Sequence, residues 1–327
     1  MAASFLPLLR NPHALTILGN FWPRSLHPRY PSKDRYYQTE PEVRILAHEQ
    51  RPLGPSRAEL ILLHGLEGSS SAGYMVSMAQ DALLAGLAAT RLNMRTCGGT
   101  EHLCPTLYHA GLTSDLRRVL EIVKNEDRGP VFLCGFSLGG NVVLKLAGEL
   151  GPGGSDLLAG VCAVGTPLHL GACVDKMAEP QNRLYEHRFV QRLKARYRRR
   201  QQQAPDRFPA RDLDAIRTVL EFDDRITAPA FGFRGARHYY DTQSAIHFLP
   251  RIAVPTLLIQ AQDDPLIPFS LYQSDAVRGN ECITLVAPEH GGHLGFIARR
   301  RPRFWADTVV LHWIQEQILR KERLPIG

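Results

Sequence analysis

Short apolar runs alternate with amphipathic stretches along most of this chain, and this alternation limits the possible folds more than any other feature. The apolar runs are rich in aliphatic and β-branched residues, and the stretches between them have a helical period. The runs are 59–64, 88–93, 131–134, 158–164, 256–261 and 283–286, and the clearest amphipathic stretches are 74–84, 114–124, 141–150 and 305–319. This order predicts βαβ units, and therefore an α/β fold with a mostly parallel, doubly wound sheet covered by helices on both faces.

The alternation stops between residues 168 and 250, where no strand-like run occurs. Tyr185, Phe189, Leu193 and Tyr197 follow one another at four-residue spacing, which predicts a helix with one apolar stripe. Prolines at positions 205, 209 and 229 divide the remainder into short pieces. We therefore expect one domain over residues 1–327, with 168–250 as a helical cap inserted before the strand at 256–261.

The positive charge of the chain is concentrated in that helix. The formal net charge is +7, and residues 183–201 carry eight Arg and Lys against Glu186, so the remainder is about neutral. One interpretation is a solvated face of the cap. The other is peripheral docking on an anionic membrane or on nucleic acid, aided by the arginines at 299, 300, 301 and 303. We expect no nucleic acid partner and keep the anionic membrane as the alternative.

The cysteines and the N-terminal segment favour a reducing, cytoplasmic location. The six cysteines show no C-x-x-C spacing, and Cys134 and Cys162 lie inside apolar runs, where reduced thiols pack as small hydrophobic groups. The stretch 5–18 is interrupted by polar residues and Pro12, which argues against a signal peptide. No window has the length and apolarity of a membrane span.

A G-x-S-x-G pentapeptide at 135–139 supplies the candidate nucleophile, Ser137. It follows the apolar run 131–134 and precedes the amphipathic stretch that begins at Asn141, which is the strand, turn and helix order that this motif requires. The glycines are needed because the serine occupies a sharp turn with close neighbours. The positive end of the following helix would favour a developing oxyanion.

A second glycine-rich loop, HGLEG at 64–68, directly follows the strand predicted at 59–64. A loop in this position commonly gives one backbone N–H of an oxyanion hole, and the residue after the nucleophile gives the other. We therefore expect the N–H groups of Leu66 and Leu138 to form the hole. His64 is expected to make structural hydrogen bonds at the strand end.

The remaining catalytic residues are expected in the order serine, acid, histidine. Asp263 and Asp264 follow the strand at 256–261, and His290 and His293 follow the strand at 283–286. Asp264 is favoured over Asp263 because the following proline restricts its backbone to extended conformations. His293 is favoured over His290 because two glycines place it on an uncrowded turn.

A metal site built from the same histidines and aspartates is the competing interpretation, because two imidazoles and two carboxylates are suitable ligands for zinc or iron. It leaves the serine turn and the loop at 64–68 without a role, whereas a triad uses all four motifs. We expect neither a metal nor a cofactor.

Several segments resemble the YheT-like α/β-hydrolases, a group related to medium-chain ester synthases. They are LLHGLEGSSSAGYM, CGFSLGGNVVLKLAGE, QAQDDPLIP and EHGGHLGF, together with NPHALTIL, NMRTCGGTEHLCPTLYHAG, EFDDRITAPAFGF and HYY. The resemblance implies the α/β-hydrolase fold, with Ser137 as nucleophile, Asp264 as acid and His293 as base. It departs locally at Met94 and Thr96, where an aromatic residue and a glycine are expected around Arg95.

The resemblance also implies a serine esterase that cleaves short- to medium-chain acyl esters. Acyl transfer to an alcohol and thioester hydrolysis are alternatives, since the same triad serves them. An alternative of another class is a membrane- or nucleic-acid-docking module that uses the basic helix at 183–200. A further alternative is a pseudo-enzyme or pure binding module that keeps the fold without turnover.

Overall fold

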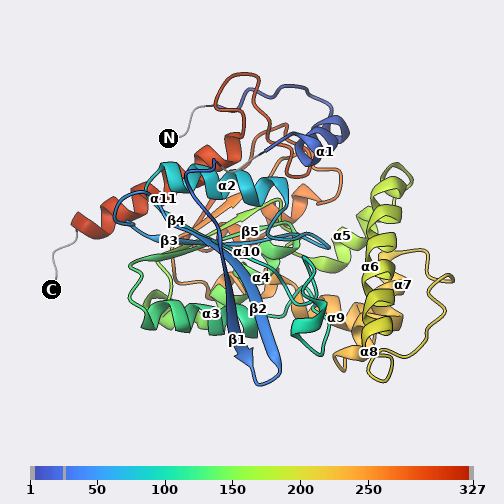
Figure 1. The fold of residues 1–327 in the computed structure, drawn as a ribbon. Coiled ribbons are helices and arrows are strands. Elements are labelled where there is room, and N and C mark those ends of the chain that lie inside the picture. Colours follow the sequence, from blue (N-terminus) through green and yellow to red (C-terminus); the bar gives the residue numbers. More distant parts are fainter. Residues whose placement is uncertain (1–3, 25–26, 324–327) are drawn as a thin grey trace.

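The computed structural model describes residues 4–24 and 27–323, and an eight-stranded sheet forms its centre (Figure 1). The strand order is β1-β2-β4-β3-β5-β6-β7-β8, and every pair from β4 to β8 is parallel. The strands are β1 (Lys33–Glu40), β2 (Val43–Gln50), β3 (Glu59–Leu63), β4 (Ala88–Leu92), β5 (Val131–Phe136), β6 (Gly160–Val164), β7 (Thr256–Ile259) and β8 (Ile283–Val286). The predicted α/β class and all six predicted strands are confirmed.

The antiparallel hairpin β1–β2 is absent from the sequence prediction. β1 pairs with β2, and β2 pairs antiparallel with β4 at the edge of the parallel sheet. The sequence of β1, KDRYYQTE, is polar because the strand is mostly exposed. In β2 only Val43, Ile45 and Ala47 alternate toward the core. A strand of this kind lacks the continuous apolar run that marks a buried parallel strand.

Helices cover both faces of the sheet (Figure 1). On one face α2 (Gly73–Leu84) packs against α11 (Trp305–Arg323), and on the other α4 (Leu138–Leu150) lies on β5 and β6 beside α3 (Ser114–Asn125). The other elements outside the β6–β7 connection are α1 (Pro12–Phe21), α10 (Asp275–Arg278), η1 (Glu101–Leu103), η2 (Gly151–Asp156) and η7 (Phe269–Gln273). No helix in the described ranges has both the length and the apolarity needed to cross a membrane.

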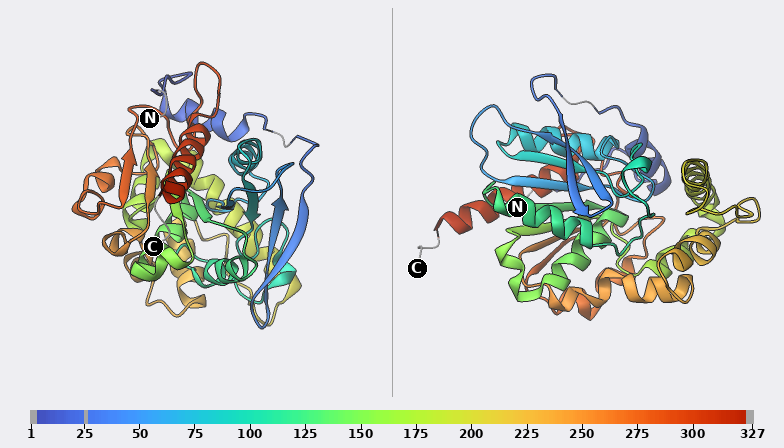
Figure 2. Two further views of the ribbon diagram at one scale, coloured as in Figure 1. Left: turned by 90° about the vertical axis from the view of Figure 1, so that its left-hand side faces the viewer. Right: turned by 60° about the horizontal axis from the view of Figure 1, so that its bottom comes forward.

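The connection from β6 to β7, all of which the structure describes, consists of helices and loops and contains no strand. It contains α5 (Leu170–Met177), η3 (Pro180–Asn182), α6 (Arg183–Gln203), α7 (Val219–Phe222), the π-helix η4 (Asp223–Thr227), α8 (Ala228–Ala230), α9 (Ala236–Gln243), η5 (Ala245–His247) and η6 (Leu249–Arg251). Figure 2 shows α6, in yellow-green, standing away from the sheet. We propose that residues 168–250 act as a cap inserted into a single domain.

Helix α6 is less solvated than its charge suggests. Its apolar stripe packs on the core, with Leu193 and Tyr197 buried and Tyr185 and Phe189 half-buried. Two of its arginines, which sequence analysis placed on the remaining faces, are also buried. Their guanidinium groups form hydrogen bonds with the HGLEG loop and with residues 96–104. A basic face that is solvated along its whole length is therefore a wrong description of this helix.

The first of these buried arginines, Arg196, contacts both the HGLEG loop and the segment that departs from the family pattern. Its guanidinium bonds Glu67 Oε1 at 2.8 Å and Thr96 Oγ1 at 3.0 Å. Thr96 has a φ of 62°, in the left-handed region that favours the glycine expected there. The Thr96 hydroxyl thus accepts a hydrogen bond from Arg196 that a glycine could not.

Candidate active site

Ser137 lies on the sharp turn between β5 and α4 that the sequence predicts. Its backbone has φ 50° and ψ −122°, a strained conformation for a residue with a side chain. A Cβ at Gly135 would overlap the Gly139 carbonyl, and one at Gly139 would overlap the carbonyls of Leu63 and His64. The flanking glycines therefore let β3, β5 and α4 pack closely around the serine.

His293 lies between Ser137 and Asp264. Its Nε2 atom is 3.0 Å from Ser137 Oγ, and its Nδ1 atom is 2.9 Å from Asp264 Oδ2. The His293 backbone N–H donates to Thr16 Oγ1 at 2.8 Å, which ties the histidine loop to α1. Gly292, with φ 57°, lets this loop pass close to the α1 backbone, because a Cβ there would overlap the Pro12 carbonyl.

The two aspartates of the sequence bind different histidines. Asp264 is buried, and its Oδ1 atom accepts the N–H groups of Leu266 at 2.8 Å and Ile267 at 3.1 Å. Asp263 instead lies 3.1 Å from His290 Nδ1 and accepts the Gly292 N–H. Of the two aspartates, Asp264 is thus the one placed to orient His293.

The backbone around Leu66 is fixed by two tyrosine hydroxyls. The N–H groups on either side, from Gly65 and Glu67, donate to Tyr74 and Tyr108, each at 3.0 Å. A Cβ at Gly65 would lie 3.0 Å from the Ser137 Cβ, so this glycine brings the loop against the serine. Leu66 and Leu138 both line the pocket that Ser137 and His293 line, which is a suitable position for an oxyanion hole.

His64 is buried behind this loop and makes the structural hydrogen bonds expected of it. Its Nε2 atom accepts the Met94 N–H at 3.1 Å, which leaves Nδ1 to donate to the Gly65 carbonyl at 2.8 Å. Burial lowers the pKa of His64 to about 4, so the ring is neutral near pH 7.

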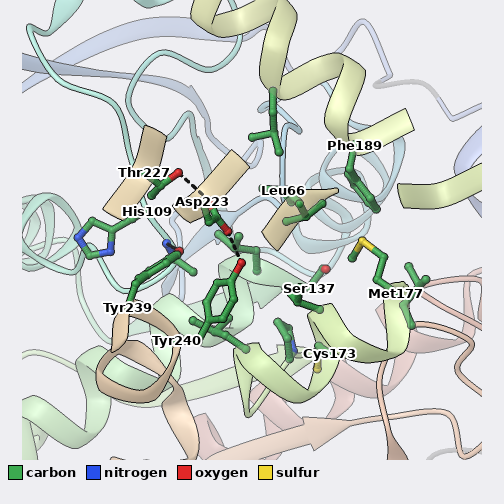
Figure 3. Close-up of a pocket in the computed structure, with 18 of the residues that line it drawn as sticks. Leu66, His109, Ser137, Cys173, Met177, Phe189, Asp223, Thr227, Tyr239 and Tyr240 are labelled. Atoms are coloured by element: carbon green, nitrogen blue, oxygen red, sulfur yellow. Dashed lines mark hydrogen bonds between the residues drawn. The ribbon is translucent and has the colours of Figure 1, made fainter. Parts of the chain in front are cut away.

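Two pockets meet at Ser137 and His293. The inner pocket holds about 770 Å³, including the part open to solvent, and is lined by residues of α5 and α6, among them Cys173, Met177 and Phe189 (Figure 3). Most of its wall is aliphatic, aromatic or sulfur-bearing, with Leu170, Cys173, Val174, Met177, Phe189 and Leu193 among the lining residues. Such a wall suits an apolar chain.

One end of the inner pocket is polar, which sequence analysis missed. The Asp223 carboxylate accepts hydrogen bonds from the hydroxyls of Thr227 and Tyr240, each at 2.6 Å (Figure 3). Desolvation raises the pKa of Asp223 to about 6. Burial also lowers the pKa of His109, on the same wall, to about 3. The available signal was the pair of segments EFDDRITAPAFGF and HYY, whose polar residues meet here.

The outer pocket lies between α1 and α6 and holds about 860 Å³, including its open mouth. Ser137, His293, Leu66, Phe189 and Leu266 line both pockets. The remaining wall of the outer pocket comes from α1, the HGLEG loop, the start of α2, α6 and Leu294. It includes Thr16, Asn20, Tyr74, Arg188 and Arg192, and among the residues that the structure describes it contains no Asp or Glu.

The competing metal site depends on His290 and His293 converging with the aspartates. Instead, each of these histidines bonds a different carboxylate. Among residues 4–24 and 27–323, no three His, Cys, Asp or Glu side chains are grouped so that they could hold an ion.

A serine on a strained turn, bonded to a histidine that is bonded to a buried aspartate, defines the serine-hydrolase class of site. A family model described as alpha/beta hydrolase fold matches residues 59–299. The chain belongs to the α/β-hydrolase family, and the resemblance to YheT-like proteins is confirmed.

Similar proteins agree with this assignment. YheT of Escherichia coli (strain K12), an esterase by name, is 30% identical over 96% of this chain and 93% of its own length. The monoacylglycerol lipase of Saccharomyces cerevisiae is 28% identical over 84% of this chain and 61% of its own length. Among solved structures, a Pyrococcus furiosus esterase superposes with a TM-score of 0.58 at 16% identity, over 90% of this chain and 98% of the esterase.

Proposed function

We propose that this protein is a serine esterase that cleaves carboxylic acyl esters through an acyl-enzyme on Ser137. The observation that carries the proposal is the hydrogen-bonded series Ser137–His293–Asp264, with distances of 3.0 and 2.9 Å. The relatives support ester hydrolysis as the class of reaction, since their names include an esterase and a monoacylglycerol lipase.

In the first half of the reaction His293 Nε2 removes the Ser137 proton as the serine oxygen attacks the ester carbonyl. Asp264 keeps the other ring proton on Nδ1 and stabilises the imidazolium that forms. The N–H groups of Leu66 and Leu138 hold the tetrahedral oxyanion. Collapse of this intermediate releases the alcohol, which takes its proton from His293.

In the second half a water molecule, deprotonated by His293, attacks the acyl-enzyme and releases the acid. Acyl transfer to an alcohol or cleavage of a thioester would use the same residues. The mostly apolar wall of the inner pocket supports an acyl chain in that position, and the proposed length of this chain is short to medium.

Labelling with a fluorophosphonate probe, followed by ester hydrolysis over a series of acyl lengths, tests this proposal. Wild type should be labelled, and Ser137→Ala should lose labelling and about 10³-fold or more of its turnover while it retains its folded circular dichroism spectrum. Hydrolysis by Ser137→Ala at near the wild-type rate would contradict the mechanism.

A further inference from the structure

The two pockets at Ser137 differ in the kind of group that each can accept. Attack on an ester places the acyl chain on one side of the serine and the alcohol part on the other. The inner pocket is mostly apolar and its polar end is already hydrogen-bonded within the protein. The outer pocket carries cations, and no described residue of its wall is a carboxylate. The acyl chain therefore fits the inner pocket, and the alcohol part fits the outer one.

Four arginines of α6, at 188, 192, 196 and 200, recur at four-residue spacing and so form one stripe along the helix. The C-terminal two are buried and used within the protein: Arg196 pairs with Glu67, and Arg200 donates to the carbonyls of Glu101 and Cys104. The N-terminal two, Arg188 and Arg192, line the outer pocket.

Arg188 and Arg192 have no ion pair with any carboxylate in the described ranges, unlike Arg198 and Arg199, which pair with Asp214 and Glu101. Burial and the charge of Arg192 both lower the pKa of Arg188. The Arg188 guanidinium also lies 5.2 Å from the centre of the Phe21 ring, a contact that holds it at the pocket. The mouth thus presents two adjacent, mutually repelling guanidinium groups, and an anion placed between them would relieve that repulsion.

We propose that the outer pocket is the alcohol subsite and that Arg188 and Arg192 select esters whose alcohol part carries a phosphate. Guanidinium groups bind phosphate through paired, charge-assisted hydrogen bonds, and two of them match the near-dianionic charge of a phosphate monoester. The inference rests on the esterase function proposed above. It makes the arginine pair a specificity determinant, distinct from the residues that perform the chemistry.

The test compares 1-hexanoylglycerol with 1-hexanoylglycerol 3-phosphate, which share the acyl chain and the ester bond and stay monomeric at low concentration. Wild type should favour the phosphate ester in kcat/KM by about tenfold, the effect of a charge-assisted contact at a partly exposed site. Arg188→Gln/Arg192→Gln should bring the ratio of kcat/KM for the two esters, measured within the same variant, close to one. Added salt should weaken the preference in wild type.

The matched control is Arg183→Gln/Arg198→Gln, which removes the same charge from the exposed surface of the same helix without touching either pocket. It should keep the preference. Equal loss of the preference in both double variants would indicate that the positive charge of the whole helix, and not one pair of arginines, attracts the phosphate. That result would overturn the inference, as would a wild-type ratio of kcat/KM near one. If the ratio of kcat/KM for the two esters is the same with and without the two arginines while Ser137 remains essential, only this inference fails. If Ser137→Ala still cleaves the esters, the proposed esterase mechanism fails.

Two further measurements separate phosphate recognition from other outcomes. Glycerol 3-phosphate, but not glycerol, should protect Ser137 of wild type from fluorophosphonate labelling and should not protect the Arg188→Gln/Arg192→Gln variant; this result decides the matter even if neither hexanoyl ester is cleaved. Vesicles that contain phosphatidylserine should change the rate of 1-hexanoylglycerol cleavage by the same factor in both proteins. A vesicle-dependent rate increase in wild type that the variant lacks would show surface docking and overturn the subsite.

Discussion

The adjacent aspartates offer a matched test of the acid in the proposed triad. Asp264 and Asp263 each bond a histidine ring, at 2.9 and 3.1 Å, but only His293 reaches Ser137. Replacing each aspartate by asparagine keeps the shape of the side chain and removes its charge. The two variants carry the same chemical change and remove the carboxylate from different histidines.

The expected effect of Asp264→Asn follows from its four hydrogen bonds. Oδ1 accepts two backbone N–H groups, from Leu266 and Ile267, and an amide oxygen can still do so. Oδ2 accepts from Gln260 Nε2 at 3.1 Å and faces His293 Nδ1. An amide nitrogen in that place is itself a donor, so His293 must present an unprotonated Nδ1 and carry its proton on Nε2.

With the proton on Nε2, His293 cannot accept the proton of Ser137. The equivalent tautomer error in serine proteases costs about 10⁴-fold in kcat, which corresponds to about 5.5 kcal/mol at the transition state. Asp264→Asn should therefore lose about 10⁴-fold in kcat on p-nitrophenyl butyrate. Asp263→Asn should stay within about tenfold of wild type.

Thermal unfolding serves as the control, because loss of the Gln260 hydrogen bond should lower the free energy of unfolding by only about 1 kcal/mol. The reasoning is refuted if folded Asp264→Asn keeps kcat within tenfold of wild type. It is equally refuted if Asp263→Asn is the more damaging change.

Two further predictions concern buried charges. Burial raises the pKa of Asp307, which accepts a hydrogen bond from Ser77, to about 7. Because the folded protein then binds more protons than the unfolded chain between about pH 4 and 7, stability should fall as pH rises through that window, and Asp307→Asn should flatten this slope in urea titrations. Arg196→Gln leaves the buried Glu67 carboxylate without its counter-ion and should lower the free energy of unfolding by about 3 kcal/mol; Glu67→Gln/Arg196→Gln should be less destabilised, and equal losses in chemical denaturation would contradict the pairing.

The sequence predicts the parallel part of the sheet because burial on both faces demands continuous apolar runs, which are visible in one dimension. The hairpin β1–β2 escapes prediction because its outer strand is held by antiparallel pairing at an exposed edge. The turn around Ser137 is predictable for a different reason. A side chain at either flanking glycine would clash, so the turn can be recognised from three residue positions of the sequence.

The choice between Asp263 and Asp264 lay at the limit of what sequence could predict. The proline after Asp264 favours an extended backbone there, yet nothing local shows which histidine each carboxylate will meet. In the structure the difference depends on the N–H groups of Leu266 and Ile267, which hold Asp264, and on that of Gly292, which holds Asp263. These partners belong to turns whose geometry depends on the surrounding fold, so the residue spacing alone does not reveal them.

The basic helix α6 shows why a local net charge is a poor guide to function. A stripe at four-residue spacing places four arginines in one line, but the helix passes from the open outer pocket to the buried η1 segment along its length. Toward η1, Arg196 pairs with Glu67, and Arg200 donates hydrogen bonds to backbone carbonyls. Over the outer pocket, Arg188 and Arg192 form no ion pair with a carboxylate among residues 4–24 and 27–323. The charge left for a ligand is thus that of Arg188 and Arg192, beside the serine, which favours selection of a single small anion over adhesion along the whole helix.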